Sequence, residues 1–305
     1  MISVVIPLYN KEKQVGRTLE SVLAQTFRDF EVVIVDDGST DGSAEVVKTF
    51  DDPRIRLIHQ ANAGVSAARN RGIDAARYDY IALLDADDLW EPEYLATQVN
   101  LIKKYPECDV FATDYVMQKE HGERINTIIN KLPFKTESGI LTNYFEVAAC
   151  SNPPLWTSSS IISKNAIISV GGFPICIKVG EDLLTWARLA CRFKIAYNRT
   201  PLATFNIEGY GFAEKPKREP EEPDIVGKEL MALAKEFNTP HIKEYIALWF
   251  KMRSSVYLRL RQNRKSIKEA LRGLRFNPYN KKLYAYILLN VLPDRLKNRI
   301  INHAK

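Results

Sequence analysis

The stretch Tyr80-Ile81-Ala82-Leu83-Leu84-Asp85-Ala86-Asp87-Asp88-Leu89-Trp90 indicates how the rest of the chain is organised. Its apolar first half predicts a buried strand, and the acids that follow predict the strand's C-terminal edge, because a core does not tolerate unpaired carboxylates. Asp85 and Asp87 offer the oxygen ligands that Mg²⁺ and Mn²⁺ prefer, often together with a bound diphosphate. The alternative is a polar turn in which Asp88 or Glu91 caps the next helix.

Strands and helices alternate on both sides of this stretch. The predicted strands cover residues 2–6, 31–35, 55–58, 80–84 and 109–114, and the predicted helices lie around Val15–Leu23, around Val46 with Thr40 or Asp41 as cap, around Arg69, and from Pro92 onward. Parallel neighbours need crossover connections, so this alternation predicts a mostly parallel α/β sheet. Ligands of such sheets bind outside the carboxyl ends of the strands, where Tyr9, Asp37 and the acids 85–88 all emerge. We therefore predict a ligand crevice at this edge.

The turn after the first strand excludes the commonest nucleotide-binding proteins of this class. It reads Pro7-Leu8-Tyr9-Asn10-Lys11-Glu12, whereas a dinucleotide dehydrogenase needs Gly-X-Gly-X-X-Gly at this place, and the P-loop pattern is also missing. A bound diphosphate then needs another source of positive charge, and a metal on Asp87 with Arg69 or Lys11 nearby would supply it. A sugar nucleotidyltransferase would also place acids and a metal at a sheet edge, but its glycine-rich, lysine-bearing loop is absent.

Composition sets broader limits. The 305 residues are 46% hydrophobic and carry a formal net charge of +6, which permits an anionic partner. The four cysteines are scattered without a Cys-X-X-Cys pair, so neither a zinc site nor a redox motif is indicated, and a reducing cytoplasm fits best. Residues 2–6 do not resemble a secretory signal, and the apolar stretch Leu283–Leu292 is shorter than the roughly 20 residues that cross a bilayer.

A series of motifs resembles the family 2 glycosyltransferases. In chain order they are Val4-Val5-Ile6-Pro7-Leu8-Tyr9-Asn10, Gln25-Thr26-Phe27, Val35-Asp36-Asp37-Gly38-Ser39-Thr40-Asp41, Asn62-Ala63-Gly64 with Ala68-Arg69-Asn70-Arg71-Gly72, Leu84-Asp85-Ala86-Asp87-Asp88 and, more weakly, Gly171-Gly172-Phe173 and Gly180-Glu181-Asp182. The resemblance extends to about residue 205. It implies a GT-A type of α/β fold, a Rossmann-like and mostly parallel central sheet flanked by helices, and sugar transfer from a nucleotide-activated donor with inversion at the anomeric carbon.

The resemblance also implies roles for single residues. It assigns Tyr9 and Asp37 to the nucleoside, Asp85 to the ribose side, and Asp87, with Asp85, to the metal. The predicted donor-binding residues are Pro7, Tyr9, Asn10, Glu12, Asp37, Asn62, Arg69, Asp85 and Ala86, and the predicted cofactor is Mn²⁺ or Mg²⁺. Because Asp37 at a strand end can accept a hydrogen bond from an imide N–H, we expect a UDP-sugar donor rather than a GDP-sugar.

The pair Glu181-Asp182 matches the family's general base, with Asp182 preferred over Glu181. A sugar hydroxyl is a weak nucleophile, so direct displacement needs a carboxylate opposite the leaving diphosphate. The apolar Leu183, Leu184 and Trp186 beside Asp182 would raise its pKa. Alternatively, the two acids merely begin a helix, whose positive N-terminal end favours them.

Departures from the family pattern refine the expected function. We find neither the Gln-X-X-Arg-Trp motif nor the membrane-spanning helices of processive synthases, so we expect non-processive transfer to a hydroxyl of a glycan or lipid-linked acceptor, in cell-surface polysaccharide or lipopolysaccharide synthesis. Many relatives place a metal- or phosphate-contacting His after the core domain, where this chain has Glu208, which is either a substitute or a solvated loop acid. A nucleotidyltransferase and a non-catalytic binding module on the same fold remain the alternatives.

Three regions are predicted along the chain. Residues 1–213 form the GT-A domain, with a donor half of about 1–115 and an acceptor half of about 116–213, and the prolines and charges of 214–224 predict a linker or flap. Residues 225–305 form a basic helical appendage with helices at 225–237, 242–261, 266–275 and 283–292.

The appendage combines basic and aromatic residues. They are Lys251, Arg253, Arg259, Arg261, Arg264, Lys265, Lys268, Arg272, Arg275, Lys281 and Lys282, interleaved with Trp249, Phe250, Tyr257, Phe276, Tyr279, Tyr284 and Tyr286. Such a surface suits an anionic membrane, to which each basic residue contributes about 1 kcal/mol near the headgroups. The alternative is a packed helical subdomain with a solvated basic face. We expect a cytoplasmic protein that contacts the inner face of the membrane peripherally and binds no nucleic acid.

Overall fold

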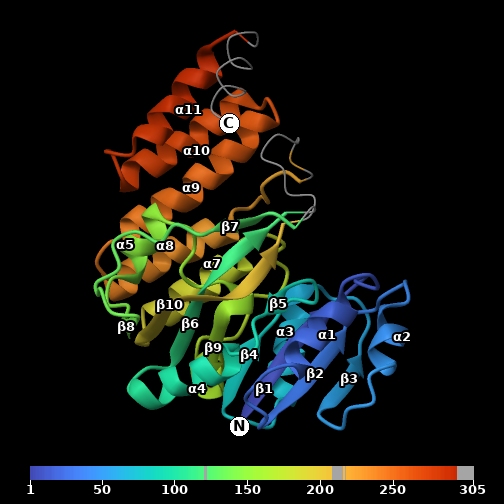
Figure 1. Cartoon of the computed structure of the whole chain (residues 1–305). Helices are drawn as coiled ribbons and strands as arrows, with labels where there is room; N and C mark the ends of the chain where they lie inside the picture. The colour runs from blue at the N-terminus through green and yellow to red at the C-terminus, as the bar shows by residue number, and fades with distance from the viewer. Residues whose placement is uncertain (120–121, 208–215, 217, 294–305) are drawn as a thin grey trace. The chain divides into compact units, whose positions relative to one another are not determined.

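The computed structural model describes residues 1–119, 122–207, 216 and 218–293 (Figure 1). The chain divides into two compact units, Met1–Glu208 and Gly209–Lys305, called here the N-terminal unit and the helical unit. The N-terminal unit is an α/β structure in which strands and helices alternate, as the sequence predicts.

The strands of this unit are β1 (Ile2–Leu8), β2 (Phe30–Asp36), β3 (Ile55–His59), β4 (Tyr80–Leu83), β5 (Leu89–Trp90), β6 (Val110–Gln118), β7 (Arg124–Asn126), β8 (Ser138–Ile140), β9 (Ser160–Ser163) and β10 (Ile195–Asn206). Its helices are α1 (Val15–Leu23), α2 (Ser43–Lys48), α3 (Val65–Ala75), α4 (Tyr94–Lys104), α5 (Tyr144–Cys150), α6 (Lys164–Ser169) and α7 (Glu181–Ala190), with a short 3₁₀ helix η1 (Thr157–Ser159).

The strands form one sheet in the order β3-β2-β1-β4-β9-β6-β10-β5, with β7 beside β6 and β8 beside β10. The first four strands are parallel, as predicted. Beyond β4 the sheet is mixed, because β9 runs antiparallel to both β4 and β6, and β5 runs antiparallel to β10. The direction of a strand depends on the chain that connects it to its neighbours and not on its own residues. The short apolar run of β9 therefore does not predict that this strand is antiparallel.

The parallel strands are buried on both faces. Alternate residues of β1 and β2 pack on opposite sides of the sheet: Val4 and Ile34 share a core with Leu19 of α1, whereas Val33 packs with Ala68 of α3. This double covering explains why β1 and β2 read as continuous runs of Val and Ile instead of alternating with polar residues.

Helix α3 approaches β1 closely at Gly72. A Cβ added to Gly72 would lie 2.3 Å from Cγ1 of Val5, so no other residue fits at this position without a shift of the helix. Since α3 also carries Arg69, the close packing fixes the depth at which that side chain enters the site.

Helix α2 begins one residue later than the predicted caps suggest. Gly42 occupies the N-cap, and neither Thr40 nor Asp41 does. Asp41 instead accepts a hydrogen bond from the backbone N–H of Ser43 (3.0 Å) and a second bond from its hydroxyl. The carboxylate therefore satisfies the helix start from the turn that precedes it.

Helix α4 begins at Tyr94 after Glu93, and no side chain caps it, so the alternative in which Asp88 or Glu91 is the cap is wrong. The two-residue strand β5 lies between the acids and α4 and pairs with β10. A strand of this length has no periodicity that sequence reasoning could detect.

The helical unit contains α8 (Ile225–Phe237), α9 (Ile242–Arg259), α10 (Asn263–Phe276) and α11 (Lys281–Val291), which confirms the four predicted helices. Helix α9 packs against α8, α10 and α11. A Cβ on Gly273 of α10 would lie 2.8 Å from Leu283 of α11, so this glycine permits the close contact of the two helices. Within the described residues, no helix has the length and apolar character needed to traverse a bilayer.

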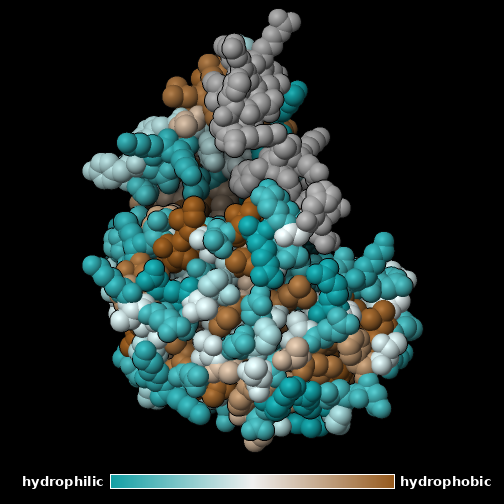
Figure 2. All heavy atoms as spheres, viewed as in Figure 1, coloured by the Kyte–Doolittle hydropathy of each residue, from teal (hydrophilic) through white to brown (hydrophobic). Residues whose placement is uncertain are grey.

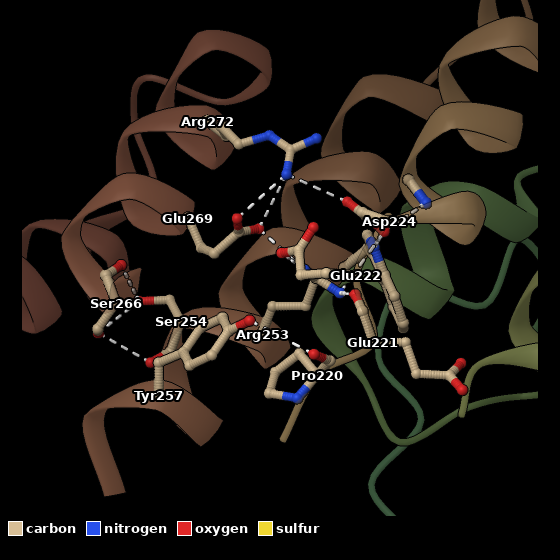
Figure 3. A network of polar contacts seen from close by, with 12 residues as sticks. Pro220, Glu221, Glu222, Asp224, Arg253, Ser254, Tyr257, Ser266, Glu269 and Arg272 are labelled. Carbon is tan, nitrogen blue, oxygen red and sulfur yellow. Dashed lines mark hydrogen bonds and ion pairs between the residues drawn. The ribbon is translucent and has the colours of Figure 1, made fainter. Parts of the chain in front are cut away.

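A buried polar network joins these helices to the chain before α8 (Figure 3). The side chain of Arg253 is only 3% exposed, and it donates to Glu269 (3.0 Å), to the Glu222 carboxylate (2.6 Å) and to the carbonyl of Glu221 (3.0 Å). Arg272 pairs with Glu269 and with Asp224 (3.2 Å).

This network corrects two expectations. Residues 219–224 were predicted to lie in a linker or flap, but Glu222 and Asp224 pair with arginines of the helical unit and Glu219 pairs with Lys265. This part of the segment is therefore attached to the helices, although Glu219 and Glu222 remain more than half exposed. Arg253 and Arg272 pair internally instead of adding to a basic surface, and Trp249, Phe250 and Tyr257 are buried core residues. The packed-subdomain alternative therefore describes this inner part of the appendage.

Candidate functional site

The acids that follow β4 lie at the carboxyl edge of the parallel strands, as predicted. The backbone N–H of Leu84 still bonds to Val5 of β1 (3.1 Å), and the chain then leaves the sheet. The side chains of Asp85 and Asp87 are 24% and 27% exposed, whereas Asp88 is buried. Two of these three acids therefore face solvent and the third points into the protein.

Asp88 holds the acidic loop in place. Its carboxylate accepts hydrogen bonds from the Ser158 hydroxyl, from the Trp156 indole N–H (3.4 Å) and from the backbone N–H of Asn206 (3.0 Å). The Asn206 side chain also donates to the carbonyl of Asp87. Burial raises the pKa of Asp88 to about 8, and the nearby charges of the other two acids add to this shift. Sequence reasoning missed Ser158, Trp156 and Asn206, because isolated polar or aromatic residues in loops carry no pattern.

Arg69 of α3 bridges two acids that are far apart in the sequence. Its side chain is 5% exposed and donates to Asp85 (2.8 Å) and to Glu181 (3.4 Å). The guanidinium also lies 5.0 Å from the centre of the Phe173 ring. Arg69 was expected to neutralise a donor diphosphate, but its charge is already used by protein carboxylates, which keep its pKa above the ordinary value.

Glu181 and Asp182 form the first turn of α7, after Gly180 in the left-handed conformation. Burial raises the pKa of Glu181 to about 7, with repulsion from Asp182 acting in the same direction and attraction to Arg69 opposing it. Burial also raises the pKa of Asp182, and the N–H of Leu183 and Arg69 oppose the shift. The acids do begin a helix, but Arg69 links this helix start to Asp85. Two carboxyl groups with raised pKa values therefore lie beside the acidic loop.

Asn70, next to Arg69, positions α7. Its side chain donates to the carbonyl of Phe173 and accepts from the Phe173 N–H, both at 2.8 Å. Gly172, with a φ of +66°, has no room for a side chain, because a Cβ would lie 2.6 Å from the Asn70 amide oxygen. The Phe173 ring then packs edge-on against Trp186 of α7. The motif that contains Arg69 and Asn70 and the motif Gly171-Gly172-Phe173 therefore pack together as one structural unit.

The turn after β1 exposes some of the predicted donor-binding residues. Tyr9 is 47% exposed. Asn10 accepts from the backbone N–H of Thr40 (2.8 Å), and Glu12 accepts from that of Gly42 (3.3 Å), so both fasten this turn to the one after β2.

Pro7 and Ala86 were also predicted to bind the donor. Pro7 lies inside β1, and the side chains of both residues are buried. A contact of these two residues with the donor would therefore have to involve their backbone atoms, and it stays a prediction.

Asp37 shapes the loop that contains Asn62. Its carboxylate accepts from the Gln60 side chain (2.7 Å) and from the backbone N–H groups of Ala63 (2.9 Å) and Gly64 (2.8 Å). These bonds hold the loop close to the turn after β2, with Asn62 exposed. Asp37 itself is only 3% exposed, so these three bonds use its carboxylate inside the protein, and its contact with a nucleobase stays a prediction.

Lys11 is the second cation of the site. Its ammonium pairs with the Asp87 carboxylate, and the two side chains are 36% and 27% exposed. Its backbone N–H donates to the Ser43 hydroxyl (2.7 Å). The side chain is therefore attached to a fixed backbone but is itself partly solvated.

The residues present fit a divalent cation that binds with a diphosphate. Magnesium is usually held by one or two carboxylates together with phosphate oxygens and waters, and Asp85 and Asp87 supply such a pair. Among the described residues, no group of three His, Cys, Asp or Glu side chains is placed to hold a metal by itself. Glu208, the candidate additional ligand, lies outside the described residues.

Comparison with known proteins agrees with this geometry. The model of the family described as Glycosyl transferase family 2 matches residues 3–163. An uncharacterized glycosyltransferase of Rickettsia felis is 31% identical over 210 residues, which are 68% of this chain and 33% of the relative. The glycosyltransferase GlyA of Streptococcus pneumoniae is 40% identical over 116 residues, 37% of this chain and 16% of that protein. The chain thus spans a third or less of the length of these relatives.

A solved structure extends the comparison to the fold. Staphylococcus aureus TarS 1–349, solved in complex with UDP-GlcNAc, superposes with a TM-score of 0.66 over 95% of this chain and 90% of that chain, at 18% sequence identity. At this identity the likeness concerns the fold alone. It confirms the predicted GT-A type of α/β structure with C-terminal helices.

Proposed function

The chain belongs to glycosyl transferase family 2, and from this premise we propose that it transfers a sugar from a nucleotide-diphosphate donor, with a UDP-sugar favoured, to a hydroxyl of a glycan or lipid-linked acceptor. The complex of TarS with UDP-GlcNAc supports the choice of donor class, because the two proteins share a fold. The pathway that we propose is non-processive synthesis of a cell-surface polysaccharide or lipopolysaccharide.

The observation that carries this proposal is the bridge from Asp85 through Arg69 to Glu181. It joins the acid on the donor side to the pair that contains the candidate base, although these residues lie on different elements. A displacement reaction needs both parts within one site, since the base and the leaving group act on opposite sides of the same carbon.

In the proposed reaction Asp182 accepts the proton of the acceptor hydroxyl as its oxygen attacks the anomeric carbon. The bond from that carbon to the diphosphate breaks on the opposite face, so an α-linked donor gives a β-linked glycoside. The raised pKa of Asp182 makes the carboxylate a better proton acceptor than an exposed aspartate. Before the donor binds, Arg69 partly balances the charges of the adjacent Glu181 and Asp85.

A divalent cation, Mn²⁺ or Mg²⁺, would be held by Asp87 and Asp85 together with the diphosphate, and when bound it would stabilise the charge on the leaving group. Tyr9, which is exposed, and Asp37, which holds the loop that carries Asn62, are proposed to contact the nucleoside. Asn62 is the exposed neighbour available on the facing loop.

We also propose a peripheral contact with the inner face of an anionic membrane. The exposed face of α11 carries Tyr284, Leu288 and Val291, which follow one another at helical spacing, and Lys281 and Lys282 lie exposed at its start. Figure 2 shows exposed hydrophobic atoms where Figure 1 draws α11. Apolar side chains beside lysines favour the boundary between headgroups and acyl chains.

The test of the proposed function is the Asp182→Asn variant, with Asp29→Asn, an exposed acid, as the matched control. We expect transfer to fall by about 10²–10⁴-fold, the usual worth of a general base, with little change in donor affinity. The product anomer is determined by NMR. Near-normal turnover of Asp182→Asn, or an α-linked product from an α-linked donor, would show that the base or the reaction is misassigned.

A further inference from the structure

The two cations of the site differ in how firmly they are held. Arg69 is 5% exposed and serves two carboxylates, so its withdrawal would leave buried acids without a partner. Lys11 is 36% exposed and, among the described residues, pairs with Asp87 and with no second carboxylate. A lysine ammonium is a compact, strongly hydrated charge on a flexible four-carbon stem. Of these two cations, Lys11 is therefore the one that can exchange its partner at low cost.

The backbone around Lys11 restricts this exchange to the side chain. The N–H of Lys11 bonds to the Ser43 hydroxyl (2.7 Å), and Asn10, with a φ of 51°, is fixed by its bond from the Thr40 N–H. The backbone of Lys11 is therefore fixed, and only its side chain can move the ammonium relative to Asp87. In the proposed function Asp87 is a metal ligand. The Asp87 oxygen that Lys11 contacts cannot serve the ammonium and a divalent cation at full strength at once, because the two positive charges repel each other.

We propose that Lys11 is an exchangeable counter-ion of Asp87. It neutralises this carboxylate until a divalent cation and a diphosphate bind together, and its ammonium then moves from Asp87 to the diphosphate oxygens. The proposal rests on the proposed function, since it takes Asp87 as metal ligand and a nucleoside diphosphate as the anion. Its consequence is that the cation alone binds weakly and that cation and nucleotide increase each other's affinity.

The experiment measures the two ligands separately. Binding of Mn²⁺ without nucleotide is followed by electron paramagnetic resonance, and binding of UDP in the presence of saturating Mn²⁺ by calorimetry. The variants are Lys11→Met, which removes the charge next to Asp87, and Lys13→Met, which removes an exposed charge two residues away. Asp87→Asn reports on the metal ligand itself.

We expect Lys11→Met to bind Mn²⁺ alone about 10-fold more tightly than the wild type, a figure that allows for the partial exposure of the pair. The same variant should bind UDP in the presence of Mn²⁺ about 10-fold more weakly, because the diphosphate loses a charged donor. Lys13→Met should match the wild type in both measurements, and Asp87→Asn should weaken both.

Equal Mn²⁺ affinities of Lys11→Met and the wild type would overturn the counter-ion role. Tighter Mn²⁺ binding with unchanged UDP affinity would overturn the transfer of Lys11 to the diphosphate. Failure of the proposed function would look different, because the wild type itself would then bind no UDP at any Mn²⁺ concentration.

Discussion

Replacing Arg69 by Met should destabilise the N-terminal unit in a pH-dependent manner. Methionine retains an apolar stem against Phe173 but removes the charge shared by Asp85 and Glu181. The carboxylates would then remain in a site where burial already raises the pKa values of Glu181 and Asp182. The loss is therefore electrostatic rather than a loss of volume.

The magnitude follows from the burial of the pair. Removing one partner of a buried ion pair costs about 3–5 kcal/mol in the free energy of unfolding. Asp85 is 24% exposed and is partly rehydrated in the variant, so we expect a loss of about 3 kcal/mol at pH 8, near the lower end of that range.

The loss should shrink on acidification. The folded-state pKa of Glu181, about 7, lies above its ordinary value. Such a group stabilises the fold when protonated, at low pH, and this contribution disappears as the pH rises through the folded-state pKa. Because Arg69 lowers the pKa values of Glu181 and Asp182, its removal raises them further. At pH 5 the variant binds these protons, and we expect a loss of only about 1 kcal/mol.

Urea unfolding followed by tryptophan fluorescence at pH 8 and pH 5 measures both values. Arg71→Met is the matched control, since Arg71 is an exposed arginine on the same helix, and it should change stability by less than about 0.5 kcal/mol. If Arg69→Met unfolds as Arg71→Met does at pH 8, or loses equal stability at the two pH values, the electrostatic account of this site is refuted.

The remaining predictions concern packing, the donor and the membrane. Gly72→Ala should cost about 1–3 kcal/mol in urea unfolding, because its Cβ would meet Val5, whereas Gly16→Ala, whose Cβ would meet Val46 at an ordinary 3.6 Å, should cost nothing; equal effects would contradict the close packing of α3. In a competition assay with Mn²⁺, uridine diphosphate should bind more tightly than guanosine diphosphate, and the reverse order would exclude the proposed donor. Sedimentation with liposomes should increase with anionic lipid, fall with added salt and weaken when Leu288 is replaced by Ser; salt-insensitive binding would favour the packed-subdomain interpretation.

The parallel part of the sheet could be predicted because the pattern of apolar residues and the position of the acidic residues indicate the same strand ends. The runs of Val and Ile in β1 and β2 are long, doubly covered strands, and the acids after β4 emerge where a parallel sheet presents its ligands. Two other strands, β5 and β9, lacked such signals. The direction of β9 and the existence of β5 depend on neighbours distant in sequence, and neither short strand specifies them by its own residues.

The candidate site shows the same division at the level of single residues. Residues 85–88 are predicted as one acidic cluster, yet Asp88 turns inward to Ser158 and Asn206 while Asp85 and Asp87 face outward. Which carboxylate turns inward depends on the donors that the rest of the fold brings to the loop, and these lie about 70 and 118 residues further along the chain. The residue types therefore predict where the acids lie, but they do not predict which of them is buried and which faces the ligand crevice.

Arg69 couples donor binding to the protonation of the candidate base in the proposed reaction. The same guanidinium pairs with Asp85 on the donor side and lowers the pKa values of Glu181 and Asp182 on the side of the base. A ligand that draws Asp85 away from Arg69 would leave the full charge of the arginine to Glu181 and would favour the ionised form of the pair. Binding on the donor side would thus increase the fraction of base ready to accept a proton. Arg69 transmits this effect because its buried guanidinium stays beside Glu181 when Asp85 moves.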